Sequence, residues 1–302
     1  MRWVVGTSEG LVGIDGERWL AGRPISALAG DGNGWLVLVD GHEVARVHGD
    51  EVDTLGTVDE ESGRCLLPVA GGILIGTAHA RLARLQDGDT VFLPSFEEAD
   101  GRDDWYTPWG GPPDTRSLTV SRDGLLFANV HVGGILRAGE PEAEWTPTID
   151  IDADVHQVLA DPFHPGHVVA ATARGLAETD DGGGSWRFSA EGLHAPYARA
   201  VALDGERLFL SASTGPRGGR AAVYRRLPGE DAFERCAGAL PEWFPGNVDT
   251  HCLAAGGGTV VFAAEDGRGY ASDDGGGSWR RFLGGKVRVS CVGVAASEGP
   301  GT

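Results

Sequence analysis

Five basic side chains stand near the starts of short apolar segments of the chain. They are Arg64, Arg116, His156, Arg199 and His251. The planar guanidinium group of arginine binds a carboxylate or a phosphate through two parallel hydrogen bonds, and a nearby histidine adds a further donor. If these segments are equivalent strands of a repeating fold, the five side chains meet at one place and form an anion-binding site. The alternative is that each arginine pairs with an acid of the next repeat and only stabilises the fold.

Acidic or phenolic side chains precede four of these positions by two residues. The resulting sequences are Asp114-Thr-Arg, Asp154-Val-His, Tyr197-Ala-Arg and Asp249-Thr-His. A carboxylate at this spacing can orient a histidine ring, or it can act as a general acid or base. Asp114, Asp154, Tyr197 and Asp249 are therefore the catalytic candidates if the protein is an enzyme.

Histidine is also a common metal ligand, and four histidines are expected on one face of the fold. They are His79, His131, His156 and His251. None of them belongs to an HxH or HExxH pattern, in which the spacing itself brings two imidazoles to one ion. Isolated histidines are more often hydrogen-bonded within the fold, so we expect no metal and no other cofactor. His131 is instead assigned to the anion site.

The longest connection between the apolar segments is an aromatic loop. It runs from Pro94 to Asp114 and carries Trp105, Tyr106 and Trp109 among prolines and glycines. Aromatic rings in a loop beside a binding site can stack on a sugar ring or close over a ligand. The alternative is that the loop buries its own rings as a plug.

The elements that must position these side chains are β-strands. The chain of 302 residues has 49 glycines and 16 prolines, which separate short apolar runs with period-2 patterning. Such runs between glycine-rich turns are typical of strands and hairpins. No run approaches the roughly 20 apolar residues that span a bilayer as a helix. An all-β fold is therefore expected.

One motif occurs twice, at residues 179–186 and 272–279. Both copies read Ser/Thr-Asp-Asp-Gly-Gly-Gly-Ser-Trp, and a reduced copy that keeps an acid and the tryptophan ends at Trp145. The second aspartate can accept hydrogen bonds from turn amides, the glycines allow positive φ, and the tryptophan covers the next sheet. Eight residues of the motif are therefore expected to be structural, namely Thr179, Asp181, Gly183, Trp186, Ser272, Asp274, Gly276 and Trp279.

This motif resembles the Asp-box, or BNR repeat, of sialidases, sortilin-type receptors, some glucanases and the propeller assembly factor of photosystem II. The resemblance covers nearly the whole chain as a repeat pattern, and it implies a β-propeller whose Asp-box turns face away from the ligand site. For a sialidase-like enzyme it implies an arginine cluster for a sugar carboxylate, Tyr197 as the nucleophile and one of the three aspartates above as the acid/base. The Arg-Ile-Pro signature of sialidases is absent, since residues 23–25 read Arg-Pro-Ile.

Seven equivalent strands can be recognised at a spacing of about 43 residues, which is typical of propeller blades. They cover residues 3–7, 35–39, 73–77, 125–129, 168–172, 208–212 and 260–264. The first repeat lacks an inner strand, and residues 287–294 have that pattern at the other end of the chain. We therefore predict one domain over residues 1–302, a seven-bladed β-propeller of four-stranded blades in which the C-terminal strand pairs with the N-terminal strands of blade 1. A six-bladed ring is the alternative, because the second repeat is short.

Lysine and arginine total 25 against 44 aspartates and glutamates, which gives a net charge of −19. A surface this acidic repels nucleic acids and anionic membranes. We expect a cytoplasmic monomer whose four cysteines are free thiols. Two classes of function remain. We favour a non-catalytic binding or assembly module whose central funnel holds an anionic small molecule or an acidic protein segment, over a sialidase-like glycoside hydrolase or lyase that acts on an acidic sugar.

Overall fold

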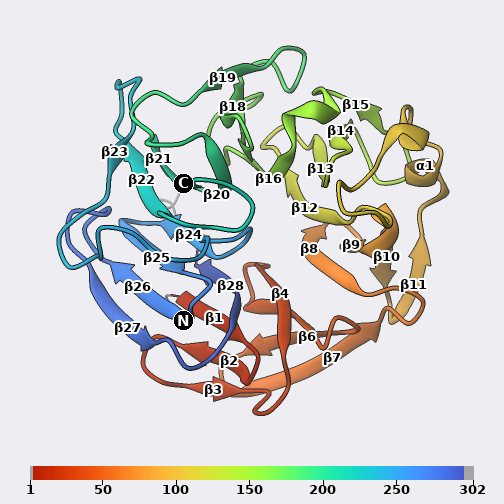
Figure 1. Cartoon of the computed structure of the whole chain (residues 1–302). Coiled ribbons are helices and arrows are strands. Elements are labelled where there is room, and N and C mark those ends of the chain that lie inside the picture. The colour runs from red at the N-terminus through yellow and green to blue at the C-terminus, as the bar shows by residue number, and fades with distance from the viewer. Residues whose placement is uncertain (1–2, 296–302) are drawn as a thin grey trace.

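The computed structural model describes residues 3–295, which form a ring of seven four-stranded antiparallel sheets (Figure 1). The predicted seven-bladed propeller is thus confirmed, and the six-bladed alternative is wrong. From blade 1 to blade 7, the inner strands are β28 (Val289–Val294), β4 (Ile25–Gly30), β8 (Gly63–Val69), β12 (Thr115–Val120), β16 (Val155–Ala160), β20 (Tyr197–Asp204) and β24 (Leu253–Gly256).

Three further strands follow outward in each blade. The second strands are β1 (Trp3–Thr7), β5 (Trp35–Val39), β9 (Gly72–Thr77), β13 (Leu126–Val130), β17 (Val168–Thr172), β21 (Arg207–Ser213) and β25 (Thr259–Ala263). The third strands are β2 (Gly10–Gly13), β6 (Glu43–His48), β10 (Leu82–Gln86), β14 (Gly134–Ala138), β18 (Gly175–Thr179), β22 (Ala222–Arg226) and β26 (Arg268–Ser272). The outer strands are β3 (Arg18–Trp19), β7 (Glu51–Thr57), β11 (Asp89–Phe92), β15 (Thr146–Pro147), β19 (Arg187–Ser189), β23 (Glu234–Arg235) and β27 (Arg280–Gly284).

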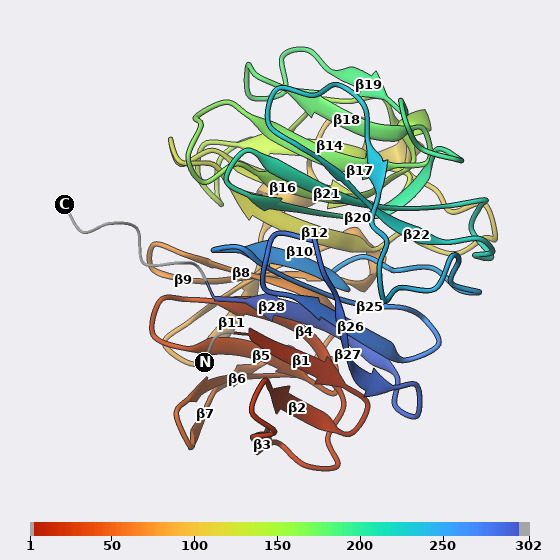
Figure 2. The ribbon, with the colours of Figure 1, turned by 90° about the vertical axis from the view of Figure 1, so that its left-hand side faces the viewer.

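Blade 1 is assembled from the two ends of the chain, as predicted. The inner strand β28 pairs antiparallel with β1, and Val292 lies opposite Val5. Figures 1 and 2 both show the two strands side by side. This pairing covers the edge that β1 would otherwise expose, which closes the ring.

The second strands explain the short apolar runs of the sequence. Residues are buried at every position of β1, β5, β13, β17 and β25. Each blade lies between two others in the ring, so both faces of its sheet are covered. The sequence of the second strand is therefore continuously apolar and does not alternate. The four cysteines are buried free thiols in the described part of the chain, as expected.

The Asp-box motifs form turns between third and outer strands. Inner strands begin at one face of the ring, here called the mouth face, and the alternation of antiparallel strands puts the third-to-outer turns on the opposite face. In the first motif, Asp181 accepts hydrogen bonds from Thr179 Oγ1 (2.7 Å) and Ser185 N–H (2.9 Å), and Gly183 has a φ of 91°. Asp274 makes the same two contacts in the second motif, at 2.7 and 2.8 Å.

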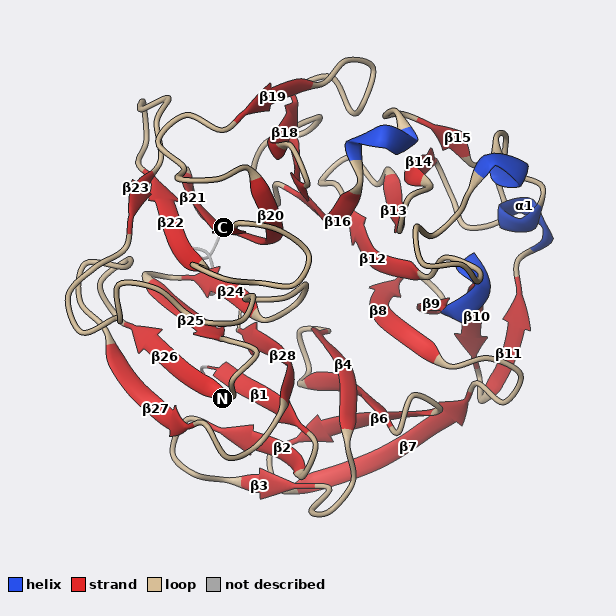
Figure 3. Ribbon diagram, in the orientation of Figure 1, coloured by secondary structure: helices blue, strands red, loops and turns tan. Residues whose placement is uncertain are grey.

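Helical turns are short and lie between strands (Figure 3). They are η1 (Ala78–Ala80) between β9 and β10, α1 (Pro94–Glu97) and η2 (Arg102–Asp104) between β11 and β12, and η3 (Ile151–Ala153) before β16. None of the helices within residues 3–295 has the length and apolar character needed to span a bilayer.

Candidate functional site

A local irregularity of the inner strands positions four of the predicted basic residues. The pairing between β12 and β13 skips Arg116, and the same shift skips Arg64 in β8, His156 in β16 and Arg199 in β20. A bulge of this kind turns the extra side chain out of the regular alternation of the strand. The repeated bulge is why equivalent positions in different blades present their side chains near the mouth face.

His251 is placed differently, and the predicted start of its strand is wrong. The strand β24 begins at Leu253, because residues 249–252 form a tight turn in which Cys252 N–H donates to the carbonyl oxygen of Asp249 (2.9 Å). His251 has a φ of 64°, and its Nε2 donates to the carbonyl oxygen of Arg116 (2.8 Å). Burial lowers the pKa of His251. Its imidazole is therefore a structural link to blade 4.

The turn that carries His251 reaches across the axis of the ring. Thr250 Oγ1 donates to the carbonyl oxygens of His156 in blade 5 (3.1 Å) and of Arg199 in blade 6 (3.3 Å). From blade 1, Val292 N–H donates to the carbonyl oxygen of His251 (2.7 Å). This turn, here called the central turn (residues 249–252), thus ties four other blades together beneath the mouth.

Arg116 carries an unsatisfied donor at the centre of the mouth. Its Nη1 atom is shielded from solvent and has no hydrogen-bond partner among residues 3–295. Burial lowers the pKa of Arg116, but the charge of Asp249 opposes that effect and the guanidinium stays protonated. The cavity beside it has a volume of about 380 Å³ and is lined by Arg64, Asp114, Asp249, His251 and Arg288, among others. An anion in this cavity would satisfy a donor whose burial is otherwise costly.

The other two predicted arginines form ion pairs between blades. Arg64 Nε lies 3.0 Å from Asp114 Oδ2, and Arg199 Nη1 lies 2.8 Å from Asp249 Oδ1. These contacts match the structural alternative for the two residues. Two of the three predicted acid/base candidates, Asp114 and Asp249, are thus paired with arginines.

His156 and Tyr197 form a hydrogen-bonded pair. His156 is fully buried, and its Nδ1 lies 2.7 Å from the carbonyl oxygen of Ala198, so Nδ1 carries the proton and donates. Its Nε2 accepts from the Tyr197 hydroxyl at 3.1 Å, and Arg199 Nη2 lies 3.4 Å from that hydroxyl. Burial lowers the pKa of His156 to about 4 and raises the pKa of Tyr197. The phenol therefore stays protonated, which disfavours its predicted role as a nucleophile.

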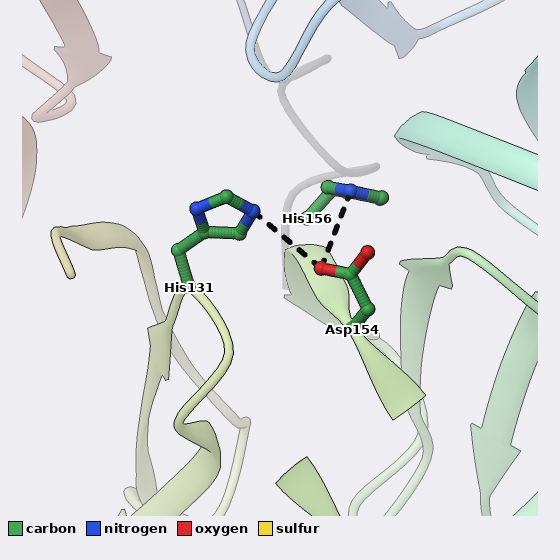
Figure 4. A group of neighbouring side chains, drawn as sticks. All are labelled: His131, Asp154 and His156. Atoms are coloured by element: carbon green, nitrogen blue, oxygen red, sulfur yellow. Dashed lines mark ion pairs between the residues drawn. The ribbon is translucent and has the colours of Figure 1, made fainter. Parts of the chain in front are cut away.

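Three metal-ligating side chains meet beside this pair (Figure 4). Asp154 Oδ1 lies 3.4 Å from His131 Nε2 and 3.6 Å from His156 Nε2. Asp154 follows η3 and His131 follows β13, so the group joins two neighbouring blades. Burial raises the pKa of Asp154, but the adjacent imidazoles and Arg116 outweigh that effect and the net pKa is lowered. Asp154 is therefore a carboxylate.

The aromatic loop divides its three rings between core and surface. Trp105 packs against Phe96, with ring centroids 6.0 Å apart, as the plug alternative requires. Trp109 is 70% exposed, and its ring lies 5.0 Å from that of His131. Tyr106 is also exposed. Only Trp109 thus contacts the predicted site residues within the described chain.

His79 lies apart from the other predicted histidines. It pairs with Glu61, with Nδ1 2.7 Å from the carboxylate. Thr250 and Gln157, by contrast, lie near the axis of the ring, and neither was predicted as a site residue. Gln157 Oε1 accepts hydrogen bonds from Val201 N–H (3.3 Å) and His251 N–H (3.4 Å). Gln157 could have been recognised as unusual because it is a polar residue inside the apolar run of β16. No sequence feature distinguishes Thr250.

The comparisons with known proteins support the fold. No protein-family model matches the chain, and no curated protein matches it. Among solved structures, a GH74 xyloglucanase from Xanthomonas campestris has a TM-score of 0.63 at 14% identity, over 93% of this chain and 46% of that one. The chain therefore spans about half the length of that xyloglucanase.

Two shorter structures match over most of both chains. YCF48 bound to a D1 peptide has a TM-score of 0.56 at 14% identity, over 93% of this chain and 88% of that one. A putative 6-phosphogluconolactonase from Bacteroides uniformis has a TM-score of 0.61 at 15% identity, over 96% and 98%. At such identities the similarity shows a shared β-propeller fold and does not assign an activity.

Proposed function

We propose that this propeller is a non-catalytic binding module whose mouth holds a carboxylate or phosphate group of a small molecule or of an acidic protein segment. The observation that carries the proposal is Arg116, whose buried Nη1 has no hydrogen-bond partner in the described chain. The cavity of about 380 Å³ beside it accommodates a carboxylate or phosphate group with a few attached atoms.

The charge distribution supports an anion rather than a neutral ligand. Three arginines, Arg64, Arg116 and Arg288, outnumber the two aspartates, Asp114 and Asp249, in the lining of the cavity. This local excess of positive charge occurs in a protein with a net charge of −19. The acidic exterior disfavours nucleic acids and anionic membranes as partners. YCF48, which shares the fold, is bound to a D1 peptide in its structure. A peptide segment is therefore a reasonable class of partner for this mouth as well, and we propose that the protein acts as a cytoplasmic monomer.

The geometry gives less support to a sialidase-like enzyme. A tyrosine nucleophile needs a neighbour that removes its proton. His156 Nε2 accepts the hydrogen bond of the Tyr197 hydroxyl, but burial lowers the pKa of His156 to about 4, which makes this imidazole a weak base. Burial raises the pKa of Tyr197 further. The arginines of the mouth also do not act together on one carboxylate, because Arg64 and Arg199 are each paired with an aspartate.

A thermal-shift screen tests the proposal. Protein treated with EDTA is mixed with small carboxylates, acidic sugars, phosphates and short acidic peptides. A ligand at 100 times its Kd stabilises by about 2.7 kcal/mol, which gives a measurable rise in Tm. We expect one class to raise Tm in the wild-type protein and in Arg84→Gln, but not in Arg116→Gln. Arg84 is the matched control because its Nε is also a buried donor without a partner among the described residues. Its other nitrogens bind Glu142 and the carbonyl oxygen of Gly71, both outside the mouth. No shift with any class would contradict the proposal.

A further inference from the structure

The group formed by His131, Asp154 and His156 has the composition of a metal site. Each of the three residues offers one possible ligand atom, and these atoms all lie within 4.8 Å of one another in the described part of the chain. In Figure 4, a ring nitrogen of His131 and one of His156 both face the same carboxylate oxygen of Asp154. From this geometry we propose that His131 Nε2, Asp154 Oδ1 and His156 Nε2 bind one divalent transition-metal ion of the Zn²⁺ class.

The spacing of the ligand atoms fits such an ion. Zinc binds imidazole nitrogens and carboxylate oxygens at about 2.0 to 2.2 Å, so two ligands at a tetrahedral angle lie about 3.4 Å apart. The distances from Asp154 Oδ1 to the two histidine nitrogens are 3.4 and 3.6 Å. The two histidine nitrogens lie within 4.8 Å of each other, so the His131 side chain has to move toward His156 for both imidazoles to bind one ion.

Two unprotonated ligand atoms of the site, His156 Nε2 and Asp154 Oδ1, lie 3.6 Å apart. Because the carbonyl oxygen of Ala198 accepts from Nδ1 of His156, the Nε2 atom of that ring is unprotonated and presents its lone pair. Asp154 Oδ1 is shielded from solvent and has no hydrogen-bond partner among the described residues. A cation between these atoms would replace a repulsive contact with two coordinate bonds.

Neighbouring groups hold the ligands in place. The contact between His156 Nδ1 and Ala198 is the outer hydrogen bond that metal-bound histidines usually make, and it fixes both the tautomer and the orientation of the ring. The Trp109 ring lies beside the His131 ring, with the ring centroids 5.0 Å apart. Thr250 Oγ1 anchors the backbone carbonyl of His156 at 3.1 Å.

The donor set defines the class of metal. Two imidazoles and one carboxylate suit Zn²⁺, Co²⁺, Ni²⁺ or Fe²⁺ better than Mg²⁺ or Ca²⁺, which prefer oxygen ligands. Three protein ligands leave at least one position open. The ion would take the Nε2 lone pair that Tyr197 now uses, so the phenol is a competitor of the metal and not a ligand in this proposal.

The metal site and the anion site can fail independently. The positive charge of Arg116 acts on both Asp154 and His156, so it opposes a cation there while it attracts an anion. Arg116→Gln should therefore leave metal affinity unchanged or raise it, although the same change abolishes the anion-induced thermal shift. A protein that binds metal but no anion would retain this inference and contradict the proposed function.

Calorimetric titration of the EDTA-treated full chain with Zn²⁺, and visible absorption after loading with Co²⁺, test the site. We expect one ion per chain, and at least a tenfold higher Kd in Asp154→Asn and in His131→Ala. His79→Ala and His164→Ala are the controls, because these histidines pair with Glu61 and Asp161 outside the group. Tyr197→Phe should not weaken binding.

Two results would overturn the inference. One is the lack of stoichiometric Zn²⁺ or Co²⁺ binding by the wild-type protein. The other is a Kd that is the same in the wild type and in a folded variant of the group. His131 is on a loop and Asp154→Asn conserves side-chain shape, so at least one of the two variants should retain the wild-type circular dichroism spectrum.

Discussion

The hydroxyl of Thr250 lies 3.1 Å from the carbonyl oxygen of His156, although the two residues are 94 positions apart and belong to blades 7 and 5. A second bond from the same hydroxyl reaches Arg199 in blade 6 at 3.3 Å. The central turn therefore links blade 7 both to the adjacent blade 6 and to blade 5, which is not its neighbour in the ring.

Loss of these two bonds should destabilise the ring. In Thr250→Val the shape is kept but the donor is lost, and two carbonyl oxygens near the axis lose a partner. We expect the free energy of unfolding to fall by about 1 to 2 kcal/mol, measured by urea denaturation. Thr250→Ser, which keeps the hydroxyl, should lose less than half as much. Equal losses in the two variants would show that the methyl contact matters and the hydrogen bonds do not.

The reduced Asp-box copy is expected to carry more stability than the exposed aromatic loop. Trp145 is fully buried, and its Nε1 donates to the carbonyl oxygen of Pro141 at 3.1 Å. Trp145→Ala should cost about 3 to 5 kcal/mol, the usual range for removal of a buried large aromatic. Trp109→Ala removes a ring that is 70% exposed and should change Tm little. Similar losses in chemical denaturation of the two variants would contradict this difference in burial.

A pH-dependent contribution to stability is expected from His167, on the face opposite the mouth. Its two ring nitrogens lie 3.0 Å from Glu178 and 3.0 Å from Asp161. The hydrogen bond to Glu178 raises the pKa of His167 more than burial lowers it. A raised pKa in the folded state stabilises the protein fully below the unfolded pKa of about 6.5, and this stabilisation is lost as the pH rises through the folded value.

His167→Gln should therefore cost more at low pH. We expect the difference in free energy of unfolding between wild type and variant to be about 1 to 2 kcal/mol at pH 5.5, and clearly smaller at pH 8.5. The measurement is urea denaturation of both proteins at the two pH values. A difference that is constant, or that grows with pH, would mean that the charged imidazole is not the stabilising species.

The sequence carried enough information for the architecture because the blades repeat. The apolar runs at 35–39 and 168–172 coincide with β5 and β17, which are buried on both faces. The missing inner strand of the first repeat and the unpaired apolar run near the C-terminus together indicated the ring closure through β28. Local patterning and the requirement for paired edges were sufficient in these cases.

The centre of the ring could be predicted only in part. The positions of Arg64, Arg116, His156 and Arg199 follow from the repeat, because the bulge recurs in their strands. Blade 7 departs from the repeat, so the turn at His251 was not predicted. The pairing of Arg64 with Asp114 joins residues 50 positions apart, and no local pattern distinguishes it from an unpaired arginine.

The contact of Asp154 with two histidines could also be predicted only in part. Its spacing from His156 suggested a partner for that ring. The sequence did not show that His131, from the preceding blade, would complete the group at 3.4 Å. Contacts between blades depend on how the sheets are arranged around the axis, which strand patterning alone does not determine.

The most direct test of the account is calorimetric titration of citrate into EDTA-treated wild type, Arg116→Gln and Arg84→Gln. If the free Nη1 of Arg116 marks an anion site, citrate binds the wild type and Arg84→Gln with one-to-one stoichiometry and the same Kd, and its Kd for Arg116→Gln is at least tenfold higher. Equal binding by all three proteins, or no binding by the wild type, would contradict the assignment of the mouth as an anion site.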